Sequence, residues 1–334
     1  MKLRAVLLSL AVAFVVVIAA AFLLRPVSFF DGFTYLRDDL NGIFSHTIKV
    51  SGVRIHYLAG GPPSGEPVVL IHGLGGRAEN WRNLAPVLAR RGYRVYMPDL
   101  PGFGRSGRPR DFSYSVKDQA EFVIAFLDAL HLRQVDLGGW SMGGWIAQID
   151  AAKHPERVKR LLIFDSAGLA VVPAWNTALF TPANADQLNQ LEALLDPAPR
   201  PIPGFVARDV IRLSHQDDWV IRRAMAAMLT GRDATTDDLL PRLEMPVLIA
   251  WGTVDRIMPL SMGETMHKLI PGSVLDLAPG CGHLAPVECT PQLTPGILAF
   301  LNTPAGQAIQ ANDRMTPLPS GGIVKAVPAS GTMP

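Results

Sequence analysis

The chain is poor in cysteine and in charge. Cys281 and Cys289 are its only cysteines among 334 residues, which excludes a disulfide-dense scaffold and a four-cysteine zinc site. Charged residues make up 18%, and 31 basic against 29 acidic residues leave a net charge of +2. A balanced chain with no long basic run does not predict nucleic-acid binding, which depends on neutralising phosphates. The 49% hydrophobic content excludes disorder of the whole chain.

The apolar excess is concentrated at the N-terminus. Ala5–Leu24 is 20 residues long, and Ser9 is its only polar member. A helix of this length spans roughly 30 Å, the thickness of the hydrocarbon core of a bilayer. We therefore expect residues 1–25 to form a signal-anchor transmembrane helix. Lys2 and Arg4 precede it, which predicts a cytoplasmic N-terminus and a periplasmic or extracytoplasmic catalytic body.

A cleavable signal peptide is the alternative for this segment. Ala19–Ala21 offers an A-x-A cleavage site, and cleavage there would give a secreted protein. Phe22–Leu24 prolongs the apolar run beyond that site, which favours the uncleaved anchor.

Strands alternate with helices between residues 46 and 301, which predicts an α/β fold with a doubly wound, mostly parallel sheet. The core is expected in residues 46–167 and 244–301. The expected strands are His46–Val50, Arg54–Leu58, Pro67–Ile71, Arg94–Met97, Gln134–Leu137, Val158–Phe164, Pro246–Trp251 and Val274–Leu277. The expected helices are Asn80–Arg90, Val116–Leu130, Gly143–Lys153, Ser261–Leu269 and Pro291–Leu301.

Three segments depart from this alternation. Residues 26–45 are interpreted as a juxtamembrane linker whose Phe29, Phe30 and Tyr35 lie at the membrane interface. Residues 168–243 show no clear strand and contain prolines at intervals. This pattern predicts an inserted segment of helical pieces that packs on top of the sheet. Residues 302–334 are rich in proline, glycine, alanine and serine, which predicts a disordered tail.

The sharpest motif is Gly139–Gly143 (GWSMG), between an apolar strand and an apolar-periodic helix. This is the context of a nucleophile elbow, in which a strained turn lifts Ser141 out of the sheet at a helix N-terminus. Glycines two residues either side avoid collisions in that turn. Ser141 is therefore the expected nucleophile.

A serine nucleophile needs a base and a group that orients it. Asp255 and His283 each follow a separate expected strand, in the order serine, acid, histidine that this fold uses. The carboxyl ends of parallel strands gather at one edge of a sheet, so these residues are the expected partners. Asp165, at the end of another strand, is a second and less favoured acid.

The loop His72–Gly76 (HGLGG) directly follows an apolar strand. Backbone amides of Leu74 and Met142 are the expected oxyanion hole, in which one donor contributes about 3–4 kcal/mol to transition-state stabilisation. Aromatic residues near these loops or in the insertion are expected to line a substrate pocket. They are Trp81, Trp140, Trp175 and Phe180.

The same loop supplies a rival interpretation. Residues 73–78 match the dinucleotide fingerprint G-x-G-x-x-A, and Asp99 stands 21 residues after Ala78, where a ribose-binding acid belongs. A dinucleotide-binding oxidoreductase would leave the elbow, Asp255 and His283 unexplained.

Taken with the sequence Asp99–Ser106 (DLPGFGRS) and Gly282-His283, these motifs resemble the α/β-hydrolase superfamily over about residues 46–301. The resemblance implies a helical lid at 168–243. With the apolar N-terminus, the chain looks like membrane-anchored bacterial lipases, esterases and monoacylglycerol lipases. It implies a serine hydrolase that cleaves carboxylic or lipid esters through an acyl-enzyme on Ser141. Carbon–carbon bond hydrolases and haloperoxidases share the triad, and a catalytically inactive binding module is a further alternative.

No cofactor or metal is expected. The eight histidines show no pair with metal-ligand spacing. An oxidising compartment permits a bond between Cys281 and Cys289, but two unpaired thiols are the favoured expectation.

Overall fold

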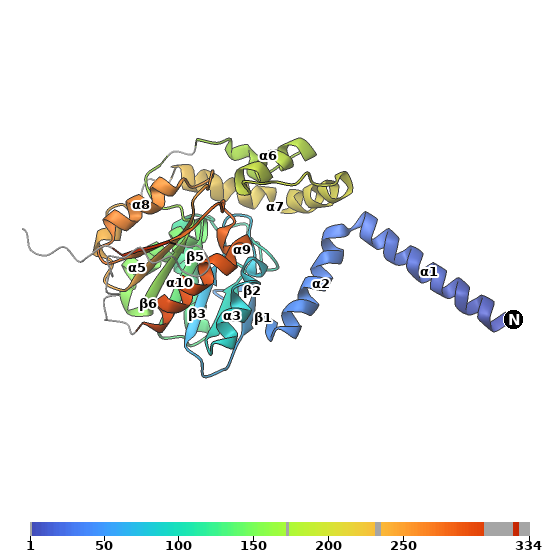
Figure 1. The fold of residues 1–334 in the computed structure, drawn as a ribbon, viewed down its shortest axis with the longest axis horizontal. Coiled ribbons are helices and arrows are strands. Elements are labelled where there is room, and N and C mark those ends of the chain that lie inside the picture. Colours follow the sequence, from blue (N-terminus) through green and yellow to red (C-terminus); the bar gives the residue numbers. More distant parts are fainter. Residues whose placement is uncertain (1, 172–173, 231–234, 304–322, 327–334) are drawn as a thin grey trace, which may run out of the picture.

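A nine-stranded sheet runs through the centre of the computed structural model, which describes residues 2–171, 174–230, 235–303 and 323–326 (Figure 1). The strand order is β1-β2-β4-β3-β5-β6-β7-β8-β9, and the neighbours from β4 to β8 pair in parallel. This confirms the predicted doubly wound, mostly parallel sheet. The strands are β1 (Ile43–Val50), β2 (Val53–Gly60), β3 (Pro67–Ile71), β4 (Arg94–Pro98), β5 (Val135–Trp140), β6 (Val158–Phe164), β7 (Val247–Gly252), β8 (Val274–Ala278) and β9 (Ile323–Ala326).

Both faces of the sheet are covered by helices, which explains the continuous apolar run of β3. Val69 and Ile71 belong to a buried cluster with α4 (Val116–Ala129), α5 (Met142–Lys153) and α8 (Leu260–Leu269). Val68 and Leu70 point the other way, into a cluster with α3 (Ala85–Arg90) and α10 (Thr290–Asn302). The helix expected over Asn80–Arg90 is divided into a 3-10 turn, η1 (Ala78–Trp81), and α3.

The segment expected to be a helical insertion contains two long helices. They are α6 (Ala185–Leu195) and α7 (Gly204–Thr230), accompanied by the 3-10 turns η3 (Thr177–Phe180) and η5 (Leu240–Arg242). Figure 1 shows α6 and α7 together at one end of the body, above the sheet. The insertion therefore lies at one edge of the sheet, where it can cover a site.

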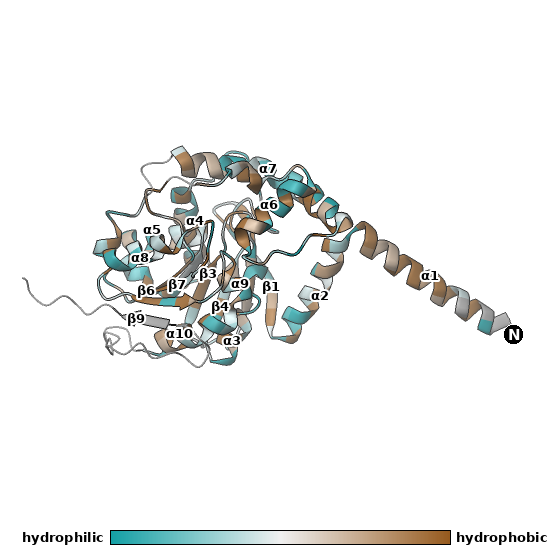
Figure 2. Cartoon of the chain, turned by 45° about the horizontal axis from the view of Figure 1, so that its top comes forward, coloured by the Kyte–Doolittle hydropathy of each residue, from teal (hydrophilic) through white to brown (hydrophobic). Residues whose placement is uncertain are grey.

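The N-terminal residues form two helices, α1 (Lys2–Leu24) and α2 (Pro26–Leu40). Figure 2 shows α1 as an almost uniformly hydrophobic rod that projects away from the body. Within the described residues no helix qualifies by itself as a membrane span, whereas Ser9–Leu24 and α2 qualify as a pair bent by 106°.

Most of the segment interpreted as a juxtamembrane linker, residues 26–45, is helical. Residues 26–40 are helical, because Pro26 suits the first turn of a helix and the helix that follows docks on the body through polar side chains. The first strand begins at Ile43, three residues before the expected start at His46.

The tail expected to be disordered is described only in part. Ile323–Ala326 forms β9, which pairs antiparallel with β8 at the edge of the sheet, so disorder does not hold for these four residues. Without β9, β8 would be an edge strand with unpaired backbone groups, and a short added strand satisfies them. The other residues from 304 onward lie outside the described part of the chain.

Candidate active site

Ser141 occupies a sharp turn between β5 and α5. Its φ of +56° is in the region that side chains rarely adopt, and it stands at the N-cap of α5. A Cβ on Gly139 would lie 2.1 Å from the carbonyl oxygen of Gly143, and one on Gly143 would lie 2.3 Å from that of Ile71. Glycine is therefore required at both positions, as the elbow motif predicts.

The structure brings together Ser141, Asp255 and His283. The Oγ of Ser141 lies 3.0 Å from Nε2 of His283, and Nδ1 of that ring lies 2.7 Å from Oδ2 of Asp255. The other carboxylate oxygen of Asp255 accepts hydrogen bonds from the amides of Ile257 and Met258 at 2.7 and 2.9 Å. A carboxylate held in this way keeps the proton of His283 on Nδ1 and leaves Nε2 as an acceptor for the serine hydroxyl.

Asp165, the second candidate acid, is placed differently. It is fully buried, has a φ of +39°, and its Oδ1 accepts a hydrogen bond from the amide of Gly252 at 2.7 Å. Burial, and then the nearby Asp255 carboxylate, raise the pKa of Asp165 well above its usual range. Asp165 therefore supports the end of β7 through its hydrogen bond with Gly252, and Asp255 is the acid in contact with His283.

His72 stabilises the loop His72–Gly76, which carries the expected oxyanion donor Leu74. Burial lowers the pKa of this histidine, and its hydrogen bonds fit a neutral ring. Its Nδ1 donates to the carbonyl of Gly73 at 2.7 Å, and its Nε2 accepts the amide hydrogen of Leu100 at 3.0 Å. The ring therefore ties the loop that carries Leu74 to the loop after β4.

The Asp99 carboxylate forms hydrogen bonds within the protein. Its side chain is buried, Oδ1 accepts the amide hydrogen of Ala78 at 2.7 Å, and Oδ2 lies 2.7 Å from Nδ1 of His56. A ribose-binding acid must be accessible to the dinucleotide. Asp99 is instead enclosed by these contacts inside the protein. Among the described residues no group of three or more His, Cys, Asp or Glu side chains could hold a metal ion.

A cavity of about 590 Å³ opens beside Ser141. Leu74 and Met142, the expected oxyanion residues, line it next to the serine. Five methionines from three helices and one loop contribute flexible thioethers to its wall. They are Met142, Met225, Met228, Met258 and Met262.

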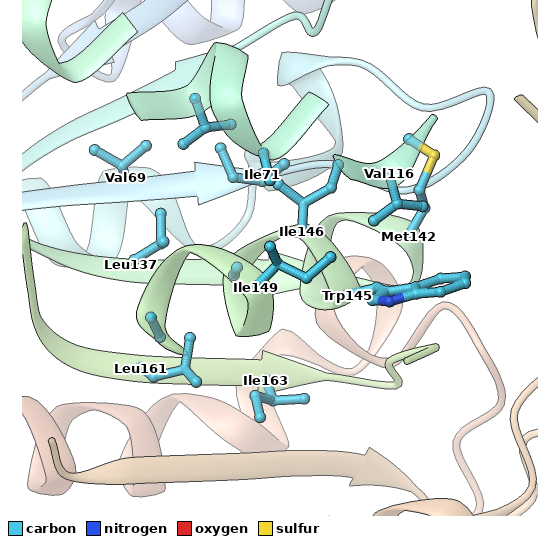
Figure 3. Packing of buried hydrophobic residues seen from close by; sticks show 14 of the residues in the cluster. Val69, Ile71, Val116, Leu137, Met142, Trp145, Ile146, Ile149, Leu161 and Ile163 are labelled. Atoms are coloured by element: carbon cyan, nitrogen blue, oxygen red, sulfur yellow. The ribbon is translucent and has the colours of Figure 1, made fainter. Parts of the chain in front are cut away.

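Two of the four expected pocket aromatics line this cavity. Trp175 and Phe180 reach it from the insertion, with ring centroids 5.2 Å apart. Trp81 and Trp140 are instead buried in the cluster on the other face of the sheet. Trp145 does line the cavity, on the same face of α5 as Met142, three residues earlier. Figure 3 shows these two side chains together at one end of the core.

The loop that carries His283 is fixed on several sides. The indole of Trp140 donates to the His283 carbonyl at 2.8 Å, and the His283 amide donates to the carbonyl of Leu195 at the end of α6. Cys281 and Cys289 form a disulfide around this loop, which corrects the expectation of two free thiols. The short helix α9 (Ala285–Glu288) turns the chain back between them, a reversal that the eight-residue spacing alone did not reveal.

Helix α2 docks on the loops that frame the site. The Arg77 guanidinium, three residues after Leu74, binds both carboxylate oxygens of Asp31 at 3.0 and 2.5 Å. Arg105, in the loop after β4, lies 4.0 Å from the ring centroid of Tyr35. A bidentate pair of this kind fixes geometry as well as adding energy. No local sequence pattern predicts this pair, because the partners are 46 residues apart.

This docking predicts that α2 helps to position the oxyanion loop. Asp31→Asn removes the charge that Arg77 faces, so we expect kcat for a short p-nitrophenyl ester to fall about 10-fold with KM little changed. Asp39→Asn, at the exposed end of the same helix, is the matched control. Equal kcat values in the two variants would show that the docking does not reach the site.

Comparison with known proteins places this chain in a known family. A family model described as the alpha/beta hydrolase fold matches residues 66–201. A 2-hydroxymuconate semialdehyde hydrolase from Pseudomonas sp. strain CF600 is 31% identical over 259 residues, covering 72% of this chain and 88% of that protein. The chain belongs to the α/β-hydrolase superfamily. The elbow at Ser141 is therefore that of an α/β hydrolase.

Other relatives of this α/β hydrolase are lipases. Lipase 1 from Psychrobacter immobilis is 28% identical over 263 residues, which cover 75% of this chain and 81% of that protein. The crystal structure of a bacterial membrane phospholipase A superposes with a TM-score of 0.73 at 30% identity, covering 90% of this chain and 98% of that one. This second likeness extends over more of the chain than the core that the motifs predict.

Proposed function

We propose that this hydrolase cleaves carboxylic esters with apolar acyl groups, as a lipase or esterase, through an acyl-enzyme on Ser141. The observation that carries the proposal is the position of Ser141. Its hydroxyl lies 3.0 Å from the His283 base and at the wall of a large, mostly apolar cavity. An acyl chain in that cavity would place its carbonyl carbon beside the nucleophile.

The proposed reaction uses only groups of this chain and water. Ser141 attacks the ester carbonyl as His283 takes its proton, and Asp255 stabilises the resulting imidazolium. The amides of Leu74 and Met142 are the proposed donors to the oxyanion. His283 then protonates the leaving alcohol, and it activates the water that releases the acid.

The cavity wall predicts a preference for long acyl chains. Phe180→Ser removes apolar surface from the cavity, so we expect kcat/KM for a long-chain p-nitrophenyl ester to fall about 10-fold more than that for the acetate. Trp175→Ser should act in the same direction. Phe44→Ser, an exposed position on β1, is the matched control. A loss of equal size on both esters would mean that Phe180 only packs the lid.

Carbon–carbon bond hydrolysis is the second candidate, because the relative at 31% identity bears that kind of name. Two further relatives are named as hydrolases of dienoic acids or dienoates, whose carboxylates need a cationic partner. Arg256 is the one charged residue among the described cavity-lining side chains, and its guanidinium donates to the Ala193 carbonyl. Turnover of a panel of p-nitrophenyl esters, monoacylglycerols and one vinylogous dienoate decides between the two reactions.

We further propose that α1 anchors the protein in a membrane, with the N-terminus cytoplasmic and the body outside. The apolar composition of α1 and the two basic residues in its first turn, Lys2 and Arg4, support this placement. The disulfide between Cys281 and Cys289 is of the kind that forms in oxidising compartments. Secretion after signal cleavage is the alternative.

The anchor predicts how the full chain fractionates. It should stay with membranes after an alkaline carbonate wash, because a spanning helix is held far more firmly than surface contacts. Intact mass should show the uncleaved N-terminus. A soluble product that begins at Phe22 would show signal cleavage and would overturn the proposal.

A further inference from the structure

A second serine, histidine and aspartate are linked near β1, the outermost strand at one side of the sheet. The Oγ of Ser45, on β1, lies 2.9 Å from Nε2 of His56, on β2. Nδ1 of that ring lies 2.7 Å from Oδ2 of Asp99, which follows β4. These two distances are close to the 3.0 and 2.7 Å found at Ser141 and His283. His56 and Asp99 are buried, whereas Ser45 is exposed to solvent.

The hydrogen bonds around Asp99 determine which groups donate and which accept between Ser45, His56 and Asp99. Burial alone would raise the pKa of Asp99, but its hydrogen bond with His56, the nearby His72 and its hydrogen bonds with the amides of Arg105 and Ala78 hold that pKa below the usual range. An ionised Asp99 accepts the Nδ1 hydrogen of His56. When the ring of His56 is neutral, its Nε2 then carries the lone pair, and the Ser45 hydroxyl can donate to it.

We propose that Ser45 is a second, surface nucleophile that accepts an acyl group from reactive carboxylic esters. Its Oγ attacks the ester carbonyl carbon, and its proton passes to Nε2 of His56. The bond between the carbonyl carbon and the leaving oxygen breaks, and that oxygen takes the proton from Nε2. The products are an ester on Ser45 and a free alcohol or phenol, so the step needs no other reactant.

The surroundings of Ser45 make this a modification site rather than a second turnover site. Ser45 lies within strand β1, whereas Ser141 stands at the N-terminus of α5 and beside a cavity. One missing oxyanion donor costs about 10²–10³-fold in rate, for the removal of the acyl group as well as for its addition. The acyl group on Ser45 should therefore form slowly and persist.

A purely structural role for His56 is the competing explanation. The Ser106 hydroxyl accepts the amide hydrogen of His56, and the carbonyl of His56 accepts that of Asp99. If the ring only joins β2 to the loop after β4, Ser45 should react no faster than any other exposed serine.

The test uses the full chain with Ser141→Ala, so that its result does not depend on the function proposed for Ser141. The protein is incubated separately with p-nitrophenyl acetate and with a fluorophosphonate, and adducts are mapped by peptide mass spectrometry. The exposed serines Ser64 and Ser261 in the same digest are internal controls.

We expect Ser45 to be modified at least about 100-fold faster than these controls, the usual gain from a positioned general base. Ser45→Ala, at an exposed position, should abolish that adduct. His56→Gln should reduce the rate on Ser45 to that of the control serines, in a protein whose folding is checked by circular dichroism. Modification of Ser45 at the rate of Ser64 and Ser261 in the Ser141→Ala chain overturns the proposal, whatever the folding of the His56 variant.

Discussion

Ser141→Ala and His283→Ala are each expected to lower kcat for a short p-nitrophenyl ester on the order of 10⁶-fold. The two side chains are joined by a 3.0 Å contact and act as one unit, so the double variant should be little worse than either single one. Asp255→Asn should cost less, about 10⁴-fold, because it changes the tautomer of His283 and leaves the nucleophile and base in place. Single-turnover and steady-state rates with one purified preparation of each variant measure these losses.

The matched control for the nucleophile is Ser261→Ala, an exposed serine on α8. Thermal unfolding of each variant separates a lost reaction from a lost fold. The assignment of the acid has its own test, since Asp165 lies buried behind the site. If Asp165→Asn were the damaging change and Asp255→Asn a mild one, the acid would be Asp165 and the contact with His283 would be incidental.

Asp276 is expected to make the hydrolase less stable as pH rises from about 4 to about 8. It lies in β8 against Gly296 of α10, and neither carboxyl oxygen has a hydrogen-bond partner among the described residues. Burial raises the pKa of Asp276 to about 7, from 3.8. The folded chain therefore holds a proton that the unfolded chain has lost over this range, and ionising the folded form costs about 4 kcal/mol.

Urea unfolding at pH 5 and pH 8 measures this effect. Asp276→Asn cannot ionise, so the variant should lose less stability than the natural chain between the two values and should be the more stable of the two at pH 8. Glu244→Gln, at an exposed carboxylate, is the control and should leave the pH dependence unchanged. An identical pH dependence in the Asp276→Asn chain would show that this carboxyl is not responsible.

Much of the core was predictable because it depends on local patterns. The apolar run of β3 and the elbow around Ser141 each carry their information within a few residues. Asp255 and His283 could be placed because parallel strands end at one edge of the sheet, so two loops far apart in sequence are near in space. The geometry of Ser141, Asp255 and His283 agrees with that placement. Their catalytic roles stay predictions until the variants are measured.

The missed features all depend on long-range contacts. Residues 26–40 carry no local sign that they form a docked helix, because Asp31 finds its partner Arg77 only in the folded chain. Trp81 and Trp140 were expected in the pocket because they adjoin the site loops. Proximity in sequence does not reveal on which face of the sheet a side chain packs. Both tryptophans pack on the face that α3 and α10 cover, away from the cavity. Strand β9 likewise depends on an open sheet edge that no local pattern reveals.

The distance along the chain between Ser141 and His283 has a consequence for synthesis. The two residues are 142 positions apart, and β6, the lid helices, β7 and β8 all lie between them. The chain is synthesised from its N-terminus onward. Helix α1, Ser141 and most of the cavity-lining residues are therefore made well before His283. Because such non-local pairings form late in folding, a chain that does not yet include His283 is expected to be hydrolytically inactive. Under the proposed mechanism, the order of residues thus delays activity until the segment that carries His283 has been made and folded.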